Sequence, residues 1–427
     1  MFTYVHRAKR AKFYRSNVIQ RVVKATGNAM SLDNINIPSQ DDINIPRNAK
    51  IERFTFTGSG GEYFKIWIVN ILLTIVTLGI YSAWAKVRNK QYFYGNTYLA
   101  GSAFEYTAEP IQILKGRIIA IAFYIAYEAA ASFYTPLYFA FLLILIIVTP
   151  WIIVKSLSFN ARYSQYRNVR FSFQQNFKSA YLVFFLIPLV LLLPVLVGII
   201  AMMAFTQVGG MSPALEKNLI YAAPLSVLVS LLAYPYVVYK TKRFIVENHS
   251  FGQTQFTSKL SNEKPFYGIY LKAYGAALLT FGTFFAILYA FGDVSTISIL
   301  TRSTGLPLWA SLLVSLGSIT AYALLFAYIS SQVYNLVYQT SKVGDNKFRA
   351  RMDTKSLAIL YVTNTIGIIL TLGFFIPWAK VRTAQYRADK TALQVNRNLE
   401  EFITNKQVEQ AAFGEEFGDV FDIDVAI

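Results

Sequence analysis

The feature that most constrains this chain is a motif that occurs twice without a gap, at residues 70–92 and 364–386. The first copy reads Asn70-(6)-Thr77-Leu78-Gly79-(4)-Trp84-Ala85-Lys86-Val87-Arg88-(2)-Gln91-Tyr92. The second reads Asn364-(6)-Thr371-Leu372-Gly373-(4)-Trp378-Ala379-Lys380-Val381-Arg382-(2)-Gln385-Tyr386. Both copies begin in strongly apolar stretches. An in-register repeat of this kind predicts an internally repeated protein.

Apolar segments dominate the chain between the two copies. Hydrophobic residues make up 55% of the 427 residues and charged residues 15%, whereas a soluble domain carries about 25% charge. A membrane span needs about 20 apolar residues. Eight segments meet that length, at about 64–84, 113–134, 137–157, 180–205, 219–240, 266–292, 308–338 and 356–378.

Basic residues follow the first, third, fifth and seventh segments, whereas the intervening loops are nearly uncharged. The positive-inside rule therefore predicts six clear spans in three hairpins, with the basic loops in the cytoplasm. The first and last segments have basic residues on both flanks. They are predicted either to span or to be re-entrant, with reversals at Gly79 and at Gly373 beside Pro377.

Short alternating aromatic runs follow asparagines in the basic loops, as in Phe104-Glu-Tyr106 and Phe171-Ser-Phe173. This alternation indicates short strands. They are predicted either to pair into a small cytoplasmic sheet or to remain irregular interfacial loops. The predicted fold class is thus an all-α polytopic membrane protein with short cytoplasmic β-strands. Its parts are a basic polar tail (1–50), a repeat-containing membrane domain (51–395) and an acidic tail (396–427).

Three blocks carry a family resemblance: Phe54-Thr-Phe-Thr-Gly58-Ser-Gly-Gly-Glu62, the Thr-Leu-Gly-(4)-Trp-Ala-Lys-Val-Arg motif, and Tyr94-Gly-Asn-Thr97 with its following Phe104-Glu-Tyr106. Over about residues 51–395 the chain resembles the YjgN family of multi-pass bacterial inner-membrane proteins. The resemblance implies a location in the bacterial inner membrane. It implies no activity, because the family supplies no established catalytic residues.

Several kinds of chemistry are excluded by composition. The chain has no cysteine and two histidines, so thiolate and multi-histidine metal centres are excluded. No nucleophile elbow, phosphate-binding loop or zinc-protease motif is present. We therefore expect no enzymatic activity and no cofactor. The net charge of +17 does not indicate nucleic acid, because the basic residues gather beside apolar segments.

A candidate intramembrane polar site combines the motif copies with one acidic residue. Asn70, Thr74 and Thr77 share one helical face, and Asn364 and Thr371 repeat the outer two positions. These residues are predicted either to line a solute path or to clamp two helices together. Glu128 is predicted to be a proton or cation site, or a carboxyl group that pairs with a neighbouring helix.

The basic part of each motif copy suggests a second candidate site. Tryptophan and basic residues anchor proteins at the membrane interface, and the two copies could together form a site for lipid headgroups. Its residues are Trp84, Lys86, Arg88, Trp378, Lys380 and Arg382. The expected partners are membrane lipids, with anionic headgroups on the cytoplasmic side, and not nucleic acid. The oligomeric state stays open.

Two functions compete on these observations. Repetition and interrupted helices favour a small-solute transporter or channel. The scarcity of intramembrane charge and the aromatic, basic cytoplasmic loops favour a non-transporting membrane protein that organises lipid or partner proteins. Transport is slightly preferred, and the sequence names no solute.

Overall fold

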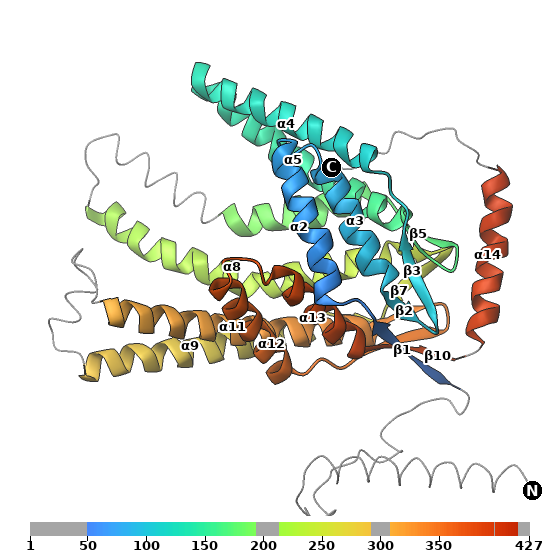
Figure 1. Ribbon diagram of the computed structural model, residues 1–427. Helices are drawn as coiled ribbons and strands as arrows, with labels where there is room; N and C mark the ends of the chain where they lie inside the picture. The colour runs from blue at the N-terminus through green and yellow to red at the C-terminus, as the bar shows by residue number, and fades with distance from the viewer. Residues whose placement is uncertain (1–48, 194–212, 292–307, 397, 417–427) are drawn as a thin grey trace, which may run out of the picture. The chain divides into compact units, whose positions relative to one another are not determined.

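The computed structural model describes residues 49–193, 213–291, 308–396 and 398–416. Within these ranges ten antiparallel strands form one closed barrel, and successive strands are connected alternately by helices and by two-residue turns (Figure 1). The strands are β1 (Lys50–Phe56), β2 (Thr97–Leu99), β3 (Ser102–Tyr106), β4 (Ser164–Tyr166), β5 (Val169–Phe173), β6 (His249–Phe251), β7 (Thr254–Ser258), β8 (Ser341–Val343), β9 (Asn346–Ala350) and β10 (Thr391–Val395). Almost all of the predicted N-terminal tail lies outside the described residues.

The barrel closes because β1 pairs with strands from both ends of the chain. Its first half pairs with β10, with Lys50 opposite Val395, and its second half pairs with β2, with Phe54 opposite Leu99. Two-residue turns join β2 to β3, β4 to β5, β6 to β7 and β8 to β9. At Ala100-Gly101 both residues have positive φ, 47° and 79°, which is the geometry that tight hairpins need. Closure leaves no free strand edge in the described sheet.

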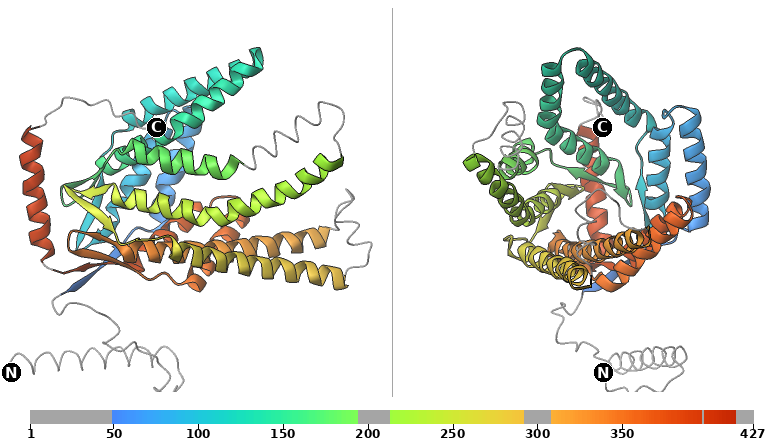
Figure 2. Two further views of the ribbon diagram at one scale, coloured as in Figure 1. Left: turned by 180° about the vertical axis from the view of Figure 1, so that it is seen from behind. Right: turned by 90° about the vertical axis from the view of Figure 1, so that its left-hand side faces the viewer.

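The helices of the connections are α2 (Gly60–Val76), α3 (Ser82–Gly95), α4 (Pro110–Phe133), α5 (Thr135–Arg162), α6 (Phe177–Tyr181), the π-helical turn η3 (Leu182–Leu186), α8 (Pro213–Glu247), α9 (Lys264–Phe291), α11 (Leu308–Thr340), α12 (Thr354–Leu370) and α13 (Ile376–Asp389). They extend from one end of the barrel and surround its axis when viewed end-on (Figure 2).

Both motif copies form the same helical hairpin. Helix α2 ends at Val76, the chain reverses, and α3 returns along α2; α12 and α13 repeat this arrangement. Leu78 and Gly79 have φ of 49° and 92°, and Leu372 and Gly373 have φ of 50° and 95°. We call α2–α3 and α12–α13 the motif hairpins. Barrel closure brings them together, since α13 packs against α2.

The predicted all-α polytopic fold with about eight hydrophobic segments is wrong. The described chain contains a closed ten-stranded barrel. Among the described helices, one segment, Pro136–Arg162, is long and apolar enough to cross a membrane by length and composition. The segments 64–84 and 356–378 fail as straight spans because left-handed residues break their helices at Gly79 and Gly373. Parts of the segments 180–205 and 266–292 lie outside the described residues.

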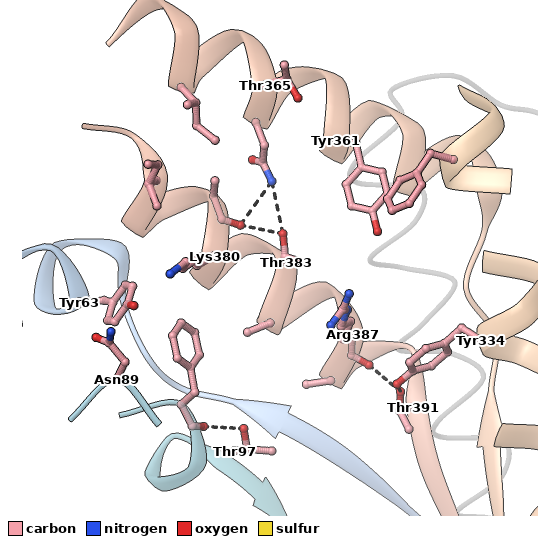
Figure 3. Close-up of a pocket in the computed structure, with 18 of the residues that line it drawn as sticks. Tyr63, Asn89, Thr97, Tyr334, Tyr361, Thr365, Lys380, Thr383, Arg387 and Thr391 are labelled. Atoms are coloured by element: carbon pink, nitrogen blue, oxygen red, sulfur yellow. Dashed lines mark hydrogen bonds between the residues drawn. The ribbon is translucent and has the colours of Figure 1, made fainter. Parts of the chain in front are cut away.

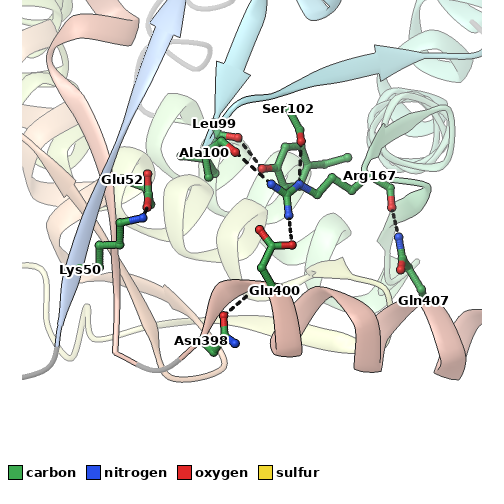
Figure 4. A network of polar contacts seen from close by, with 10 residues as sticks. Lys50, Glu52, Leu99, Ala100, Ser102, Arg167, Asn398, Glu400 and Gln407 are labelled. Atoms are coloured by element: carbon green, nitrogen blue, oxygen red, sulfur yellow. Dashed lines mark hydrogen bonds and ion pairs between the residues drawn. The ribbon is translucent and has the colours of Figure 1, made fainter.

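The described part of the predicted acidic tail forms α14 (Leu399–Glu416), which lies at the end of the barrel opposite the helices (Figure 1). Its Ile403 is buried with the inward-facing residues of the barrel. Arg167 Nη1 donates to Glu400 Oε2 at 2.6 Å, and Gln407 Nε2 donates to the Arg167 carbonyl at 2.7 Å (Figure 4). The Arg167 contact holds the pKa of the Glu400 carboxyl below its usual value.

The packing of the two motif hairpins against each other predicts different effects on stability for alanine substitutions at Gly60 and Gly61. A Cβ on Gly60 would lie 2.7 Å from Nε1 of Trp378 and closer still to Cδ1, whereas a Cβ on Gly61 would meet nothing within 4 Å. Gly60→Ala is therefore expected to destabilise the protein by about 1–3 kcal/mol, as overpacking does. Gly61→Ala is the matched control, and thermal unfolding of both variants in detergent measures the difference. Equal stabilities would contradict this packing.

Candidate functional site

A large cavity lies where the motif hairpins meet α11 at the helical end of the barrel, and it has a volume of about 1150 Å³ (Figure 3). Helix α13 supplies one wall and α12 and α11 supply others, and residues of α2, α3, β1, β2, β3 and β10 complete the lining. Most of the lining side chains are apolar or aromatic, including Phe93, Phe326 and Ile368. The cavity therefore suits a ligand with a substantial apolar part.

Three cationic residues line this cavity: Lys90 from α3, and Lys380 and Arg387 from α13. Figure 3 shows Lys380 and Arg387 along one helix, in agreement with their i, i+7 spacing. Among the described residues, no carboxylate lines the cavity, and neither Lys380 nor Arg387 forms an ion pair. The cavity thus combines an apolar wall with positive charge that no described acidic residue neutralises.

Lys90 is the most enclosed of the three cations. Its ammonium group donates to the Asn160 side chain and lies 4.5 Å from the centre of the Tyr106 ring. Burial, followed by repulsion from Lys86, lowers the pKa of Lys90 to about 8. Lys90 is therefore mostly protonated at neutral pH and loses its charge in mildly alkaline solution. An anion in the cavity would favour the charged form.

The two motif asparagines make different contacts. Asn364 lines the cavity; its Nδ2 donates to the Ala379 carbonyl at 3.3 Å, and its Oδ1 accepts from Arg382 Nη1 at 2.8 Å. Asn70 is buried behind the lining residue Asn89, whose Oδ1 accepts from Asn70 Nδ2 at 3.2 Å. Asn70 Oδ1 accepts no hydrogen bond from any residue that the structure describes. The structure therefore brings one of these two candidate residues to the cavity.

The threonines of the candidate polar site belong to the hairpin tips or the helix backbone. Thr77 Oγ1 donates to the Leu73 carbonyl and accepts from the Tyr81 amide, and Thr371 repeats this pattern with Gly367 and Phe375. Thr74 Oγ1 donates to the Asn70 carbonyl at 2.6 Å. These hydroxyl groups satisfy backbone groups where the helices end, and none lines the cavity.

Glu128 lies apart from the cavity, exposed on α4, and its side chain is within hydrogen-bonding reach of Tyr124 one turn earlier. It lines none of the described cavities. The structure thus separates Glu128 from the motif asparagines with which the sequence grouped it.

In the first motif copy, the residues predicted to bind headgroups contact other side chains of the protein. Trp84 packs against the buried cluster around Tyr106 and Ile113, and its ring stacks on Tyr81 at 6.1 Å. Arg88 Nη1 donates to the Tyr81 hydroxyl at 3.1 Å. Burial and the nearby Arg117 lower the pKa of Lys86. None of these three motif residues lines the large cavity.

The second copy contributes one cation to the cavity. Trp378 packs on Phe64, with ring centres 5.1 Å apart, and Arg382 is held by Asn364 and by Thr363 Oγ1 at 3.1 Å. Lys380 lines the cavity and lies 6.0 Å from the Tyr63 ring centre. The two copies therefore do not form one symmetric site from equivalent residues.

Sequence reasoning missed Lys90, Arg387, Asn89 and Thr383 as site residues, because none of them is a matching position of the repeat. A helical projection provides the signal that would have found them. Lys380, Thr383 and Arg387 fall on one face at i, i+3 and i+7, and Lys90 follows Lys86 by one turn. A comparison of the two motif copies does not identify these residues, because Lys90 and Arg387 each have a different residue at the equivalent position of the other copy.

Comparisons with known proteins find one family and several relatives. The family model described as "Bacterial protein of unknown function (DUF898)" matches residues 51–420. An inner membrane protein YjgN of Salmonella typhimurium is 27% identical over 354 residues, which cover 79% of this chain and 87% of that relative. Inner membrane protein YjgN of Escherichia coli strain K12 is 32% identical over 152 residues, or 35% of this chain and 37% of that relative. No solved structure matches.

Proposed function

The chain belongs to the DUF898 family of bacterial proteins of unknown function, and from that premise we propose that it is a multi-pass protein of the bacterial inner membrane that binds an anionic amphiphile. The amphiphile is a molecule such as a phospholipid, with an anionic head and an apolar tail. The observation that carries the proposal is the large cavity whose lining combines Lys90, Lys380 and Arg387 with apolar walls.

Exposed apolar surface supports the membrane part of the proposal. Helix α5 contains the segment long enough to span, and α4 packs beside it. The outer side of α4 exposes isoleucines at 118, 119, 121 and 125. Contiguous apolar surface of this kind marks a lipid or protein interface. The relatives' names as inner membrane proteins favour lipid, and α4 with α5 then forms a membrane hairpin.

The tips of the motif hairpins provide independent support. Leu78 and Leu372 are 94% and 91% exposed, and both occupy the left-handed region of the backbone. A non-glycine residue there costs about 1–3 kcal/mol and points to a functional constraint. Asparagine or glycine would suit a tip in water better. Leucine at both tips suits contact with lipid acyl chains.

Charge complementarity supports an anionic ligand. Phosphate and carboxylate groups pair with lysine and arginine through short, charge-assisted hydrogen bonds. Removing such a pair from water strengthens the interaction. Lys90 is half-buried and provides that environment, whereas Lys380 and Arg387 are exposed at the open side of the cavity. The apolar wall of the cavity supplies the area that buries the ligand's apolar part.

Transport of the bound molecule is the second candidate. It is favoured by Phe54, Phe104 and Tyr338, which line both the large cavity and the interior of the barrel. The polar residues of the two motif copies support transport less, because Asn70 does not line the cavity. Binding is therefore the better-supported function.

Binding is tested by ligand-induced stabilisation of the full-length protein in a neutral detergent. Phosphatidylglycerol is expected to raise the unfolding temperature, because a ligand at 100 times its Kd stabilises the folded state by about 2.7 kcal/mol. Phosphatidylcholine tests the need for negative charge, and glycerol 3-phosphate tests the need for the apolar tail. Both are expected to give smaller shifts. Equal shifts with phosphatidylglycerol and phosphatidylcholine would refute selective anion binding.

A further inference from the structure

We infer that the interior of the barrel receives the apolar chain of the amphiphile whose charged head lies at Lys90, Lys380 and Arg387. This inference rests on the binding function proposed above. It deepens that function by assigning the ligand one long, flexible apolar chain that passes through the helical end of the barrel. Helix α14 closes the end of the barrel interior opposite the cations and so limits the depth of the site for the apolar chain.

The interior of the barrel has the lining that an alkyl chain needs. A cavity of about 480 Å³ lies inside the strands. Strand alternation directs aromatic and aliphatic side chains into it. These are Phe54, Leu99, Phe104, Tyr166, Phe171, Phe251, Phe256, Val343, Phe348 and Leu393.

Few polar groups are available to water in this cavity. The polar side chains of its lining are Tyr166, Lys242, His249, Tyr338 and Ser341. The Tyr166 hydroxyl donates to the Leu99 carbonyl, Ser341 Oγ donates to the Val337 carbonyl, and His249 Nδ1 is hydrogen bonded to the Ile245 carbonyl. A buried water needs two to four polar partners, which an aromatic wall does not supply. Proteins otherwise pack their interiors closely. A space of this size and lining is therefore better matched by a chain of methylene groups than by solvent.

The barrel cavity continues into the cation-lined cavity. Phe54, Phe104 and Tyr338 line both spaces. They come from β1, β3 and α11, at the end of the barrel where the helices begin. An amphiphile whose head meets the three cations can therefore extend its tail between these rings without leaving protein.

Helix α14 closes the other end of the barrel cavity. This end of the cavity is lined by Leu399, Phe402 and Ile403 of α14. The ring centres of Phe402 and Phe251 lie 6.2 Å apart. The helix is held by the Arg167–Glu400 ion pair, and a Cβ on Gly252 would lie 3.6 Å from Lys406 Cβ. The site is thus a blind pocket with a limited depth, which sets an upper length for the chain it holds.

Photo-crosslinking tests this inference in phosphatidylcholine vesicles that contain full-length protein and a small fraction of a phosphatidylglycerol probe. The probe carries a diazirine at the end of one acyl chain. Peptide mapping is expected to find crosslinks at strand residues around Phe251–Phe256 and Val343–Phe348. A second probe, with the diazirine beside the headgroup, is expected to mark α13 instead.

A matched pair of variants controls for location. Val343→Trp fills the barrel cavity and is expected to abolish the chain-end crosslinks in the strands while keeping the headgroup crosslinks on α13. Ile51→Trp adds the same side chain at a position of β1 that is 47% exposed, and is expected to change neither. Retained headgroup crosslinks show that the Val343→Trp protein is folded. If this variant does not fold, the crosslinks mapped on the unmodified protein still test the inference.

Two results would overturn the inference, and they differ in what they say about binding. Chain-end crosslinks confined to the outer faces of α4 and α5, together with a selective phosphatidylglycerol shift in unfolding temperature, would refute the barrel site and leave the proposed function standing. Equal strand crosslinks from phosphatidylglycerol and phosphatidylcholine probes, without a selective shift, would refute the link between the tail site and the cations.

Discussion

Replacing Asn364 by leucine is expected to lower the free energy of unfolding by about 1.5–3 kcal/mol, the usual contribution of a hydrogen bond to a charged group. The substitution removes the bond from Arg382 Nη1 to Asn364 Oδ1, at 2.8 Å, and two bonds from Asn364 Nδ2. Arg382 keeps Thr363 as a partner, so the arginine is not wholly orphaned. Unfolding in detergent measures the loss.

The repeat supplies the matched control for this prediction. Asn70→Leu removes one 3.2 Å bond to Asn89 together with an acceptor that has no partner among the described residues. Its expected cost is below about 1 kcal/mol, because losing an unsatisfied buried oxygen offsets losing the bond. Equal losses at the two positions would contradict the different environments that the structure gives these asparagines.

The second large effect is expected at the tips of the motif hairpins. The chain has no native cysteine, so Leu78→Cys and Leu372→Cys can each be spin-labelled without background. In vesicles both labels are expected to be reached readily by oxygen, which concentrates in lipid, and poorly by a water-soluble nickel chelate. The apolar neighbours of both tips predict this outcome: Ile75, Val76, Ile80, Ile369, Leu370 and Phe374 are all more than half exposed.

Ile51→Cys is the control for the label measurement, because Ile51 lies on the outside of β1 in the barrel. Its label is expected to show the reverse preference, with ready access for the nickel chelate. If the tip labels behaved like the Ile51 label, the tips would lie in water, and the left-handed leucines would need another explanation.

The local structure was more predictable from sequence than the global one. Alternation indicated strands at Phe104–Tyr106 and Phe171–Phe173, because side chains on a strand alternate between its faces. Gly79 and Gly373 indicated chain reversals, because positive φ is accessible to glycine. Both signals lie within a few residues of sequence.

Closure of the barrel could not be predicted in this way. The sequences of strands of three to seven residues do not indicate which strands they pair with. The pairing that closes the barrel joins β1 to β10 across almost the whole described chain. The apolar segments were also misleading as a group. Hydropathy does not separate a straight span from a helix that turns back, and the latter depends on the local backbone at Leu78 and Leu372.

The candidate site was predictable in part for the same reason. The motif led to Asn364 and Lys380, which do line the cavity. It did not lead to Lys90 and Arg387, because repetition was the selecting criterion and these cations are not repeated. Likewise, it grouped Asn70 with Asn364, although Arg382 contacts Asn364 while its counterpart Arg88 contacts Tyr81. Equivalent residues diverge where neighbouring side chains differ, which a single sequence does not reveal.

The central claim, that three cations hold an anionic amphiphile, is tested most directly by native mass spectrometry of the purified full-length protein. The unmodified protein is expected to retain added phosphatidylglycerol. The double variant Lys380→Glu with Arg387→Glu is expected to lose it, since two of the three charges at the head are reversed. Lys264→Glu, an exposed charge reversal at the start of α9, is the control and is expected to retain the lipid. Equal retention by all three proteins would contradict the account.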